Sequence, residues 1–364
     1  MRCETFRFDE VTINFDRKRI PLSAKQRSER QGNYRYYGAQ GVIDYVDDYI
    51  FDGTYLLIAE DGENLKSQKQ NIAQIAKGKF WVNNHAHIVQ TNEHCDLQYL
   101  YYLINSMDLS GYITGSAQPK LSQANLNAVT LQLPSIEEQK KIVAILGALD
   151  DKTELNNKIS ENLERQAQAI FRSWFLDYLP FNSIKPTHWK FCTLGETTKM
   201  SAGGDKPKGI SNIKSTEYPY PIYSNGLDNE GLYGYTNEAK IFAESVTVSA
   251  RGTIGFVCLR HIPYVPIVRL VTLIPNENLI SAKYLYLYLK QLRISGTGTT
   301  QQQLTVPDFR KTEILIPDKI TMDKFTNLIS PMFNQIWANG EENIKLASLR
   351  DSLLPKLMSG EIEL

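Results

Sequence analysis

Residues 135–175 read SIEEQKKIVAILGALDDKTELNNKISENLERQAQAIFRSWF, and this stretch decides the fold. It contains no proline, a single glycine, and charged residues on either side of an apolar stripe. The stripe recurs at seven-residue steps, at Ile142, Leu149, Asn156, Leu163 and Ile170. A period of seven that is sustained over about four heptads predicts a long helix, which packs along a seam against another helix.

The same pattern returns 183 residues later in the chain. The equivalent steps are occupied by Phe325, Met332, Asn339, Leu346 and Leu353. We expect a neighbouring stripe to extend the seam, at Ile145, Ile159, Leu328 and Leu349. Each helix would have about forty residues and span about 60 Å, at about 1.5 Å per residue. Because neither helix can bury such a stripe alone, we expect the two to pack antiparallel on one another.

An asparagine interrupts the apolar stripe in the middle of each helix. Asn156 and Asn339 occupy equivalent steps of the two predicted seams. A single polar residue at such a position lowers stability, and its best-attested use is to fix the register between helices. The alternative is a pair of exposed or kink-associated asparagines, since Gly340 follows Asn339.

The duplication extends upstream of both helices. Residues 115–134 read GSAQPKLSQANLNAVTLQLP and residues 298–317 read GTTQQQLTVPDFRKTEILIP, and both open on Gly and close on Pro. Further upstream, TYLLIAEDG (54–62) matches SVTVSARGTIG (245–255), a short β-branched run that ends at a glycine. A compact aromatic helix is expected in each half, in LQYLYYLIN and in AKYLYLYLK. A period this long indicates a duplicated domain rather than a solenoid.

We therefore predict an α+β fold with two similar α/β domains. Two long antiparallel helices would separate the domains as a coiled-coil-like pair, and the whole would have pseudo-twofold symmetry. The predicted boundaries are 1–134 for the first domain, 135–178 for the first helix, 179–317 for the second domain, 318–358 for the second helix and 359–364 for a C-terminal tail.

The bulk composition points to a globular protein. The 364 residues contain 42% hydrophobic residues, and two domains of ordinary size are expected for this length. No stretch is apolar and long enough to cross a bilayer, and the N-terminus lacks a signal-peptide core, so we expect a cytoplasmic protein without a membrane partner. The four cysteines lie far apart without a C-x-x-C pair, which argues against a disulfide framework or a zinc knuckle.

Basic residues concentrate in loops although the net charge is zero. Residues 181–320 carry 16 Lys and Arg against 11 Asp and Glu, and DRKRIPLSAKQRSER forms a basic loop near the N-terminus. Such loops suit contacts with phosphates, while Asn, Gln, Ser and Arg reach base edges. The alternative is ordinary solvated surface charge on tolerant loops. The candidate DNA-binding residues are Arg17, Lys18, Arg19, Lys25, Arg27, Arg30, Lys120, Lys199, Lys206, Lys208, Lys214 and Arg251.

No catalytic motif stands out in the sequence. There is no P-loop, no N-P-P-Y-like element, and no Gly-rich dinucleotide loop, since GTGTTQ (296–301) lacks the third glycine. PDFRKTEIL (307–315) lacks the lysine expected of a metal-dependent nuclease core. His85 and His87 are predicted on one face of a strand, where they loosely resemble metal ligands. Hydrogen-bonding histidines in or beside the domain core are the preferred interpretation, and no catalytic or metal site is expected.

The combination of motifs resembles the specificity subunit of type I restriction–modification systems. The resemblance is carried by GSAQPKLSQANLNAVTLQLPSIEEQKKIVAIL with LDDKTELNNKISENLERQAQAIFRSWF, by the C-terminal LRDSLLPKLMSGEIEL, by PTHWKFCTLGE (186–196) and by the turn YYGAQG (36–41). It covers essentially the whole chain.

The resemblance implies a non-catalytic, DNA-reading subunit. The two domains would be target recognition domains that each read one half of a bipartite sequence in double-stranded DNA. The helices would set the unread spacer and bind two modification subunits. The chain itself would need no cofactor, because S-adenosylmethionine would bind to the modification subunits, and restriction motor-nuclease subunits would join for cleavage. The alternatives are a chain that methylates or cuts DNA by itself, and an assembly protein that dimerises through its helices without a DNA role.

Overall fold

The computed structural model describes residues 2–115, 118–296 and 303–364. Residues 116–117 and 298–302 of the two repeat segments, and residues 297–301 of GTGTTQ, therefore lie outside the described residues. The chain forms two compact units. Unit 1 comprises Met1–Leu155 with Glu342–Leu364, and unit 2 comprises Asn156–Glu341. Among the described helices, none has the length and hydropathy that a membrane crossing requires.

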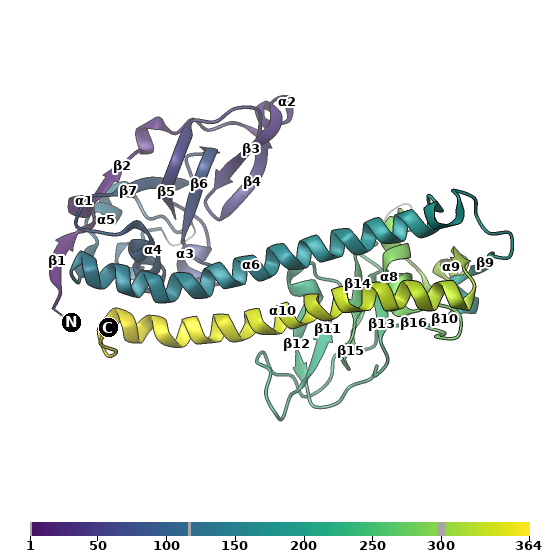
Figure 1. The fold of residues 1–364 in the computed structure, drawn as a ribbon. Helices are drawn as coiled ribbons and strands as arrows, with labels where there is room; N and C mark the ends of the chain where they lie inside the picture. The colour runs from purple at the N-terminus through teal and green to yellow at the C-terminus, as the bar shows by residue number, and fades with distance from the viewer. Residues whose placement is uncertain (1, 116–117, 297–302) are drawn as a thin grey trace. The chain divides into compact units, whose positions relative to one another are not determined.

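Two long helices dominate the secondary structure, as expected from the heptads. α6 runs over Ile136–Phe175 and α10 over Lys319–Ser359 (Figure 1). Ser135 and Glu138 cap the start of α6 reciprocally, because the Ser135 Oγ accepts from the Glu138 N–H and the Glu138 carboxylate accepts from the Ser135 N–H. Asp318 caps α10 by accepting from the Thr321 N–H at 3.0 Å. Each helix contributes one half to each unit.

The two helices are antiparallel within each unit, which confirms that prediction. In unit 1, Arg350 of α10 donates to Asp150 of α6 at 3.0 Å, and Leu357 is buried in one core with Ile142. In unit 2, Asn339 lies beside Asn156, whereas the rings of Phe325 and Phe175 are 4.8 Å apart. Residue numbers therefore rise along one helix in the direction in which they fall along the other, so the two helices are antiparallel.

The seam is built from the predicted heptad positions and from a second column that the sequence analysis misplaced. Ile142, Asn156, Phe325 and Asn339 are buried, and Leu149, Leu163, Ile170, Met332, Leu346 and Leu353 are partly buried. The predicted neighbouring stripe is wrong, because Ile145, Ile159, Leu328 and Leu349 are 37–47% exposed. The second column lies four residues after each heptad position instead of three, and includes Leu146, Thr153, Ser160, Ala167 and Trp174. Several residues of this second column are small or polar, so a search for apolar residues at helical spacing does not detect the column.

The two seam asparagines meet inside unit 2. The Asn339 side-chain amide donates to the Asn156 carbonyl oxygen at 3.3 Å and to the Ser160 hydroxyl at 3.1 Å. Gln335 donates in turn to the Asn339 side-chain oxygen at 2.7 Å. Both asparagines are at most 3% exposed, so the exposed alternative is excluded. Because buried amides need specific partners, this contact suits the fixing of a helix register.

Unit 1 is organised around one sheet of six strands, with spatial order β2-β7-β5-β6-β3-β4. The strands are β2 (Thr12–Asn14), β3 (Gln31–Gly38), β4 (Gly41–Val46), β5 (Phe51–Ala59), β6 (Ala73–Val82) and β7 (Ala86–Thr91). β1 (Glu4–Arg7) pairs separately with β8 (Thr130–Leu133). The shorter helices are α1 (Phe8–Val11), α2 (Ala24–Glu29), α3 (Asn64–Ser67), α4 (Leu97–Ser106) and α5 (Gln123–Asn127), with 3-10 turns at η1 (Asp16–Lys18) and η2 (Ser110–Tyr112).

Unit 2 has a central sheet of four strands, with spatial order β10-β16-β13-β14. Its strands are β10 (Thr198–Ala202), β13 (Ser245–Ser249), β14 (Val257–Arg260) and β16 (Leu270–Pro275). The smaller sheets are formed by β11 (Tyr220–Tyr223) with β12 (Leu232–Thr236) and β15 (Val265–Pro266), and by β9 (Lys190–Thr193) with β17 (Glu313–Ile316). The helices are α7 (Leu194–Thr197), α8 (Ala282–Gln291) and α9 (Val306–Phe309), with 3-10 turns at η3 (Leu179–Phe181) and η4 (Asp228–Gly231).

A tyrosine and a carboxylate join each aromatic helix to the adjacent half of α6. In unit 1, the Tyr102 hydroxyl of α4 donates to Asp150 at 2.7 Å, and this carboxylate also accepts from Arg350. In unit 2, the Tyr286 hydroxyl of α8 donates to Glu164 at 2.6 Å, and Lys290 donates to the same carboxylate at 2.9 Å. The aromatic helix of each unit is therefore fixed to α6 by a charge-assisted hydrogen bond.

The internal pairing confirms that the two units share one framework. β5 pairs with β7 so that Ala59 faces Ala86, and β13 pairs with β16 so that Ser249 faces Leu270. One residue further on, the Leu121 N–H donates to the Glu60 carbonyl, and the Leu304 N–H donates to the Ala250 carbonyl, both at 2.8 Å. The Glu60 and Ala250 N–H groups donate to the carbonyls of His85 and Arg269, both at 2.9 Å. These bonds make Glu60 equivalent to Ala250, and His85 equivalent to Arg269.

Candidate nucleic-acid interface

The equivalent strands of the two units end in loops that carry different side chains. We call residues 60–62 and 83–85 the strand-end loops of unit 1, and residues 250–252 and 267–269 those of unit 2. At matching places, unit 1 presents Asp61 and His85, whereas unit 2 presents Arg251 and Arg269. Asp61 Oδ2 lies 2.7 Å from His85 Nδ1. The same framework thus presents an acid–imidazole pair in one unit and two guanidinium groups in the other.

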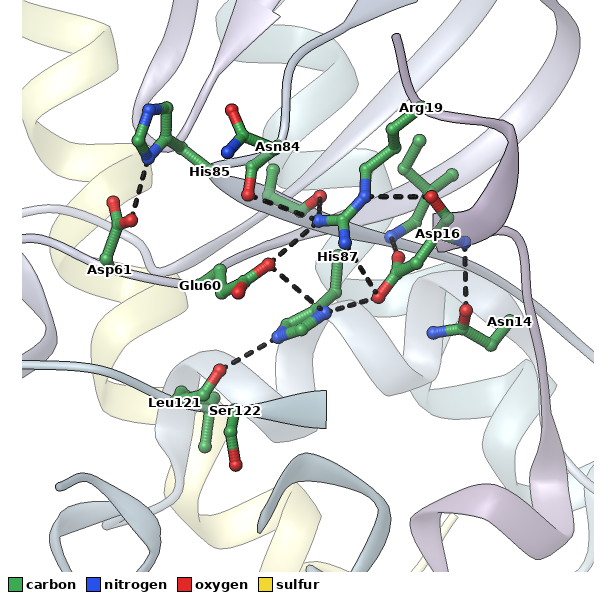
Figure 2. Close-up of polar contacts among 12 residues, drawn as sticks. Asn14, Asp16, Arg19, Glu60, Asp61, Asn84, His85, His87, Leu121 and Ser122 are labelled. Carbon is green, nitrogen blue, oxygen red and sulfur yellow. Dashed lines mark hydrogen bonds and ion pairs between the residues drawn. The ribbon is translucent and has the colours of Figure 1, made fainter. Parts of the chain in front are cut away.

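Four charged or polar side chains lie beside the strand-end loops of unit 1, where Asp16 and His87 are buried and Arg19 and Glu60 are partly buried (Figure 2). We call Asp16, Arg19, Glu60 and His87 the buried ionic network. His87 is 1% exposed, with Nδ1 2.6 Å from Asp16 Oδ2 and Nε2 2.8 Å from the Leu121 carbonyl oxygen. Arg19 Nη1 donates to Glu60 at 2.9 Å and to the Ala86 carbonyl at 2.8 Å. The network therefore ties the end of β5 to the start of β7.

The electrostatics of the network favour charged carboxylates. Burial by itself raises the pKa of Asp16, but the hydrogen bond and charge of His87, the Ile88 N–H and the charge of Arg19 together bring it below its ordinary value. Burial also raises the pKa of Glu60, and again the contacts prevail. The Arg19 hydrogen bond, the charge of His87 and the Lys120 hydrogen bond lower it overall. Both groups are thus stabilised as carboxylates by folding.

Several predicted DNA-binding residues of unit 1 are engaged within the protein. Arg19 is 14% exposed and belongs to the buried ionic network. Arg27 Nε donates to Asp44 at 2.8 Å. Arg30 donates to Asp47 at 3.0 Å and lies 5.0 Å from the Trp81 ring centroid. These contacts assign the three arginines a structural role, which sequence alone could not indicate because their acidic partners lie up to 41 residues away.

Other predicted residues of unit 1 remain accessible. Arg17 and Lys18 are exposed on η1, and Lys25 is exposed on α2. Lys18 Nζ lies 5.2 Å from the Phe15 ring centroid. Lys120 is 53% exposed and lies 3.2 Å from Glu60, at the edge of the buried ionic network. The structure thus divides the predicted basic loop into partly buried, ion-paired arginines and exposed cations.

In unit 2, the predicted lysines lie on exposed segments. Lys199 is exposed on β10, and Lys214 is exposed in the loop that follows. Lys206 and Lys208 line a groove of about 510 Å³ together with Lys240, which the sequence analysis did not single out. Lys206 Nζ lies 4.2 Å from the Tyr233 ring centroid. This groove gathers three cations from two loops, whereas Lys199 and Lys214 do not line it.

The strand-end loop that carries Arg251 is held by one amide. The Asn225 side chain donates to the Arg251 carbonyl at 2.8 Å, and the Thr253 hydroxyl donates to the Asn225 carbonyl at 2.6 Å. Gly252 has a φ of +77°, which suits glycine in this turn. On the facing loop, Arg269 has a φ of +73°, a conformation that residues with a side chain rarely adopt. The backbone is therefore fixed where the two arginines project.

The histidine prediction is confirmed in part. His85 precedes β7 instead of lying within it, so the expectation that both histidines share one face of a strand is wrong. His87 is a hydrogen-bonded residue of the core, as preferred, and both of its ring nitrogens have partners. Among the residues that the structure describes, no group of three or more His, Cys, Asp or Glu side chains is placed to hold a metal ion.

Three residues of these loops were not predicted from the sequence, namely Asp61, Asn225 and Arg269. Asp61 could have been found from the match of TYLLIAEDG with SVTVSARGTIG. In that alignment Asp61 falls at the position of Arg251, which was already a candidate. No sequence signal marked Arg269, since its equivalence to His85 rests on a backbone hydrogen bond and its φ appears only in the structure.

Comparison with known proteins identifies the family. Residues 2–165 and 186–341 match the family model of the type I restriction modification DNA specificity domain. A putative type I specificity subunit of Mycoplasma pneumoniae, S.MpnORF507P, is 27% identical over 352 residues, which cover 94% of this chain and 93% of the relative. The type I restriction enzyme MjaIX specificity subunit of Methanocaldococcus jannaschii is 27% identical over 73% of this chain and 69% of its own length.

A solved structure agrees in fold. The S subunit of a type I restriction–modification system from M. genitalium superposes with a TM-score of 0.62 at 16% sequence identity, covering 98% of this chain and 96% of that structure. The family model matches two segments, which together span most of the chain. The chain belongs to the type I restriction modification DNA specificity domain family.

Proposed function

We propose that the chain is the DNA-reading specificity subunit of a type I restriction–modification complex, in which each unit reads one half of a bipartite sequence in double-stranded DNA. One observation carries the proposal. Two units with the same internal framework present different side chains at equivalent loops, Asp61 and His85 in unit 1 and Arg251 and Arg269 in unit 2. Side chains of opposite charge on one framework suit two different sequences. This favours DNA reading over the alternative of a helix-mediated assembly protein.

The exposed cations supply the sequence-independent part of binding. Arg17, Lys18 and Lys25 in unit 1, and Lys199, Lys206, Lys208 and Lys214 in unit 2, are exposed and able to contact phosphates. Such contacts position a protein on DNA and make its affinity fall with salt. Arg19, Arg27 and Arg30 contribute indirectly by holding the fold of unit 1.

The helices have two roles in this proposal. Their 40 and 41 residues set the length of the unread spacer, and their surface binds the modification subunits. Large apolar side chains that remain exposed on α6 and α10 support the second role, because they would be covered in the complex. They include Leu155, Ile159, Leu328, Ile344 and Leu349. Catalysis is left to the partners: S-adenosylmethionine binds to the modification subunits, and the restriction subunits supply the motor and nuclease.

The function is tested by mapping methylated bases genome-wide in a host with and without the gene for this chain. The proposal predicts that one bipartite motif, two short blocks separated by an unread spacer, loses its methylation when the gene is removed. An unchanged methylation pattern would contradict it in a host that expresses the modification subunits. Loss of a single continuous motif would contradict the division between two units.

The spacer role has its own test. Removing residues 149–155 from α6 and 342–348 from α10 keeps the heptad phase and shortens the pair by about 10 Å. The preferred spacer should shrink by about 3 base pairs, at about 3.4 Å each. A matched control with alanine at the exposed, polar Asp151 and Lys345 should keep the spacer. An unchanged spacer in a folded deletion variant would exclude the helices as its determinant.

A further inference from the structure

The side chains of Arg251 and Arg269 differ from several other arginines of the two units. Arg19, Arg27, Arg30 and Arg260 all form ion pairs with carboxylates. Among the described residues, the guanidinium groups of Arg251 and Arg269 have no hydrogen bond or ion pair. Arg269 is exposed, and Arg251 is half-buried. Arginines that are held on a fixed backbone and lack an acidic partner are available to an external acceptor.

The backbone places these two residues beside one another. The Ala250 N–H donates to the Arg269 carbonyl at 2.9 Å, so the residue next to Arg251 is bonded to Arg269 itself. Asn225 fixes the first loop, and the left-handed φ of Arg269 fixes the second. Non-glycine residues persist in this conformation only where the surrounding structure enforces it, and such residues cluster at functional sites. A rigid backbone reduces the entropy cost when such side chains bind a ligand.

We propose that Arg251 and Arg269 are the guanine-reading residues of unit 2, and that the equivalent Asp61 of unit 1 reads the amino group of a cytosine. This inference rests on the proposed function and deepens it, since it names the residues and the bases. Arginine donates two hydrogen bonds to the O6 and N7 acceptors of guanine in the major groove, whereas a carboxylate accepts from the N4 amino group of cytosine. The exchange of charge at one structural position would make the two half-sites different.

The unit 1 pair has a geometry that suits this role. Asp61 is held by His85 at 2.7 Å, beside the buried ionic network, and its side chain is 20% exposed (Figure 2). His85 leaves other lone pairs of the Asp61 carboxylate available to accept a hydrogen bond. A carboxylate near DNA phosphates is repelled unless it gains a donor, so a wrong base at this place is rejected.

The experiment is a selection of bound duplexes from a randomised double-stranded DNA pool, using the full chain assembled with its modification subunits. Arg251→Gln and Arg269→Gln should each relax the preference at one guanine in the same half-site by about tenfold. Asp61→Ala should relax one position in the opposite half-site only. Replacing the affected guanine by 7-deazaguanine, which lacks the N7 acceptor, should weaken binding of the wild type and leave the matching variant unaffected.

Lys206→Gln is the matched control, because Lys206 is an exposed cation of the same unit on a different loop. It should weaken binding to all sequences alike and reduce the salt slope by about 1. If Arg251→Gln and Arg269→Gln behave like this control, with an unchanged consensus, the two arginines contact phosphates and the inference is overturned. An unchanged consensus and affinity would overturn it as well. If the wild-type complex selects no bipartite sequence, the proposed function itself fails, and that result is distinguishable because it does not involve the variants.

Discussion

The two units hold equivalent strand-end loops by different means. In unit 1, the loops rest on the buried ionic network, with His87 on β7 bonded to Asp16 on η1. In unit 2, the position of His87 is occupied by Val271, which is 2% exposed in an apolar core. The loop of Arg251 is held by the Asn225 side chain, which donates to the Arg251 carbonyl. The shared framework therefore does not require one kind of core. Charged or apolar residues can support it, provided that every buried polar group finds a partner.

Because either charged or apolar residues can support the framework, the two duplicated domains can diverge in sequence and keep the same strand pairing. Where support comes from a four-residue network, a single substitution leaves a charge buried without its partner. Where support comes from one amide and apolar packing, a single substitution removes only a few hydrogen bonds. The units should therefore differ in their sensitivity to equivalent substitutions, even though their strand pairing is the same.

The largest expected effect is that of giving unit 1 the side chain found in unit 2. His87→Val should destabilise unit 1 by about 3 kcal/mol, because the carboxylate of Asp16 stays buried and loses its closest partner. Hydrogen exchange of unit 1 peptides, measured against urea concentration, gives the change in free energy. His85→Val is the control, since its side chain is 48% exposed, and it should change stability by less than about 0.5 kcal/mol. Equal effects of the two substitutions would contradict a special role for the network.

The helix pair provides a second contrast, because its seam is polar around Asn339 in unit 2 and apolar around Leu357 in unit 1. Asn339→Ala should lower the stability of unit 2 by about 2 kcal/mol, since the Asn156 carbonyl oxygen and the Ser160 hydroxyl each lose a donor at this buried position. Urea denaturation followed by exchange of unit 2 peptides measures this change. Ile344→Ala, at a 70% exposed helix position, should leave stability unchanged. A loss below about 0.5 kcal/mol for Asn339→Ala would show that water satisfies these groups.

A smaller effect is expected when the amide support of unit 2 is removed. Asn225→Ala breaks a bond to the Arg251 carbonyl and should cost about 1 kcal/mol, less than His87→Val in unit 1. Amide exchange should accelerate in residues 249–255 and remain unchanged in unit 1. If the loop keeps its protection, the glycines and the backbone bond of Ala250 fix it without Asn225.

The smallest expected effect is the loss of unit 1 stability at low pH. Folding lowers the pKa of both Asp16 and Glu60, so their contribution is fully present above the ordinary values of 3.8 and 4.5 and is lost as pH falls through the lowered values. The stability of unit 1 should therefore fall on acidification below about pH 4.5. Asp16→Asn removes one of these carboxyls and should flatten the dependence. Urea midpoints of unit 1 from pH 3 to pH 6 test this, and an equally steep dependence in the variant would exclude Asp16 as a contributor.

Much of the fold could be predicted from sequence because the helix period and the repeat are local and redundant. The heptads located both long helices, and the matched strands located the duplicated framework. The second column of the seam was predicted wrongly. Its members Thr153 and Ser160 are not apolar, so the nearby Ile145 and Ile159 were assigned to the seam instead. The residues of the basic loop were predicted to bind DNA from their charge alone. The acidic partners of Arg19, Arg27 and Arg30 lie on β4 or directly after β4 and β5. Contacts of this kind depend on tertiary structure and leave no local pattern.

The central claim is that each unit reads its own half-site independently. The most direct measurement is the consensus of duplexes bound by a chain in which residues 186–317 are replaced by a second copy of residues 1–134, assembled with the modification subunits. Both segments end at the strand that leads into a long helix, β8 before α6 and β17 before α10. We predict that the half-site of unit 1 is selected twice, as an inverted repeat with the same spacer. A folded chain of this kind that still selects the half-site of unit 2, or a single unrelated sequence, would contradict the claim.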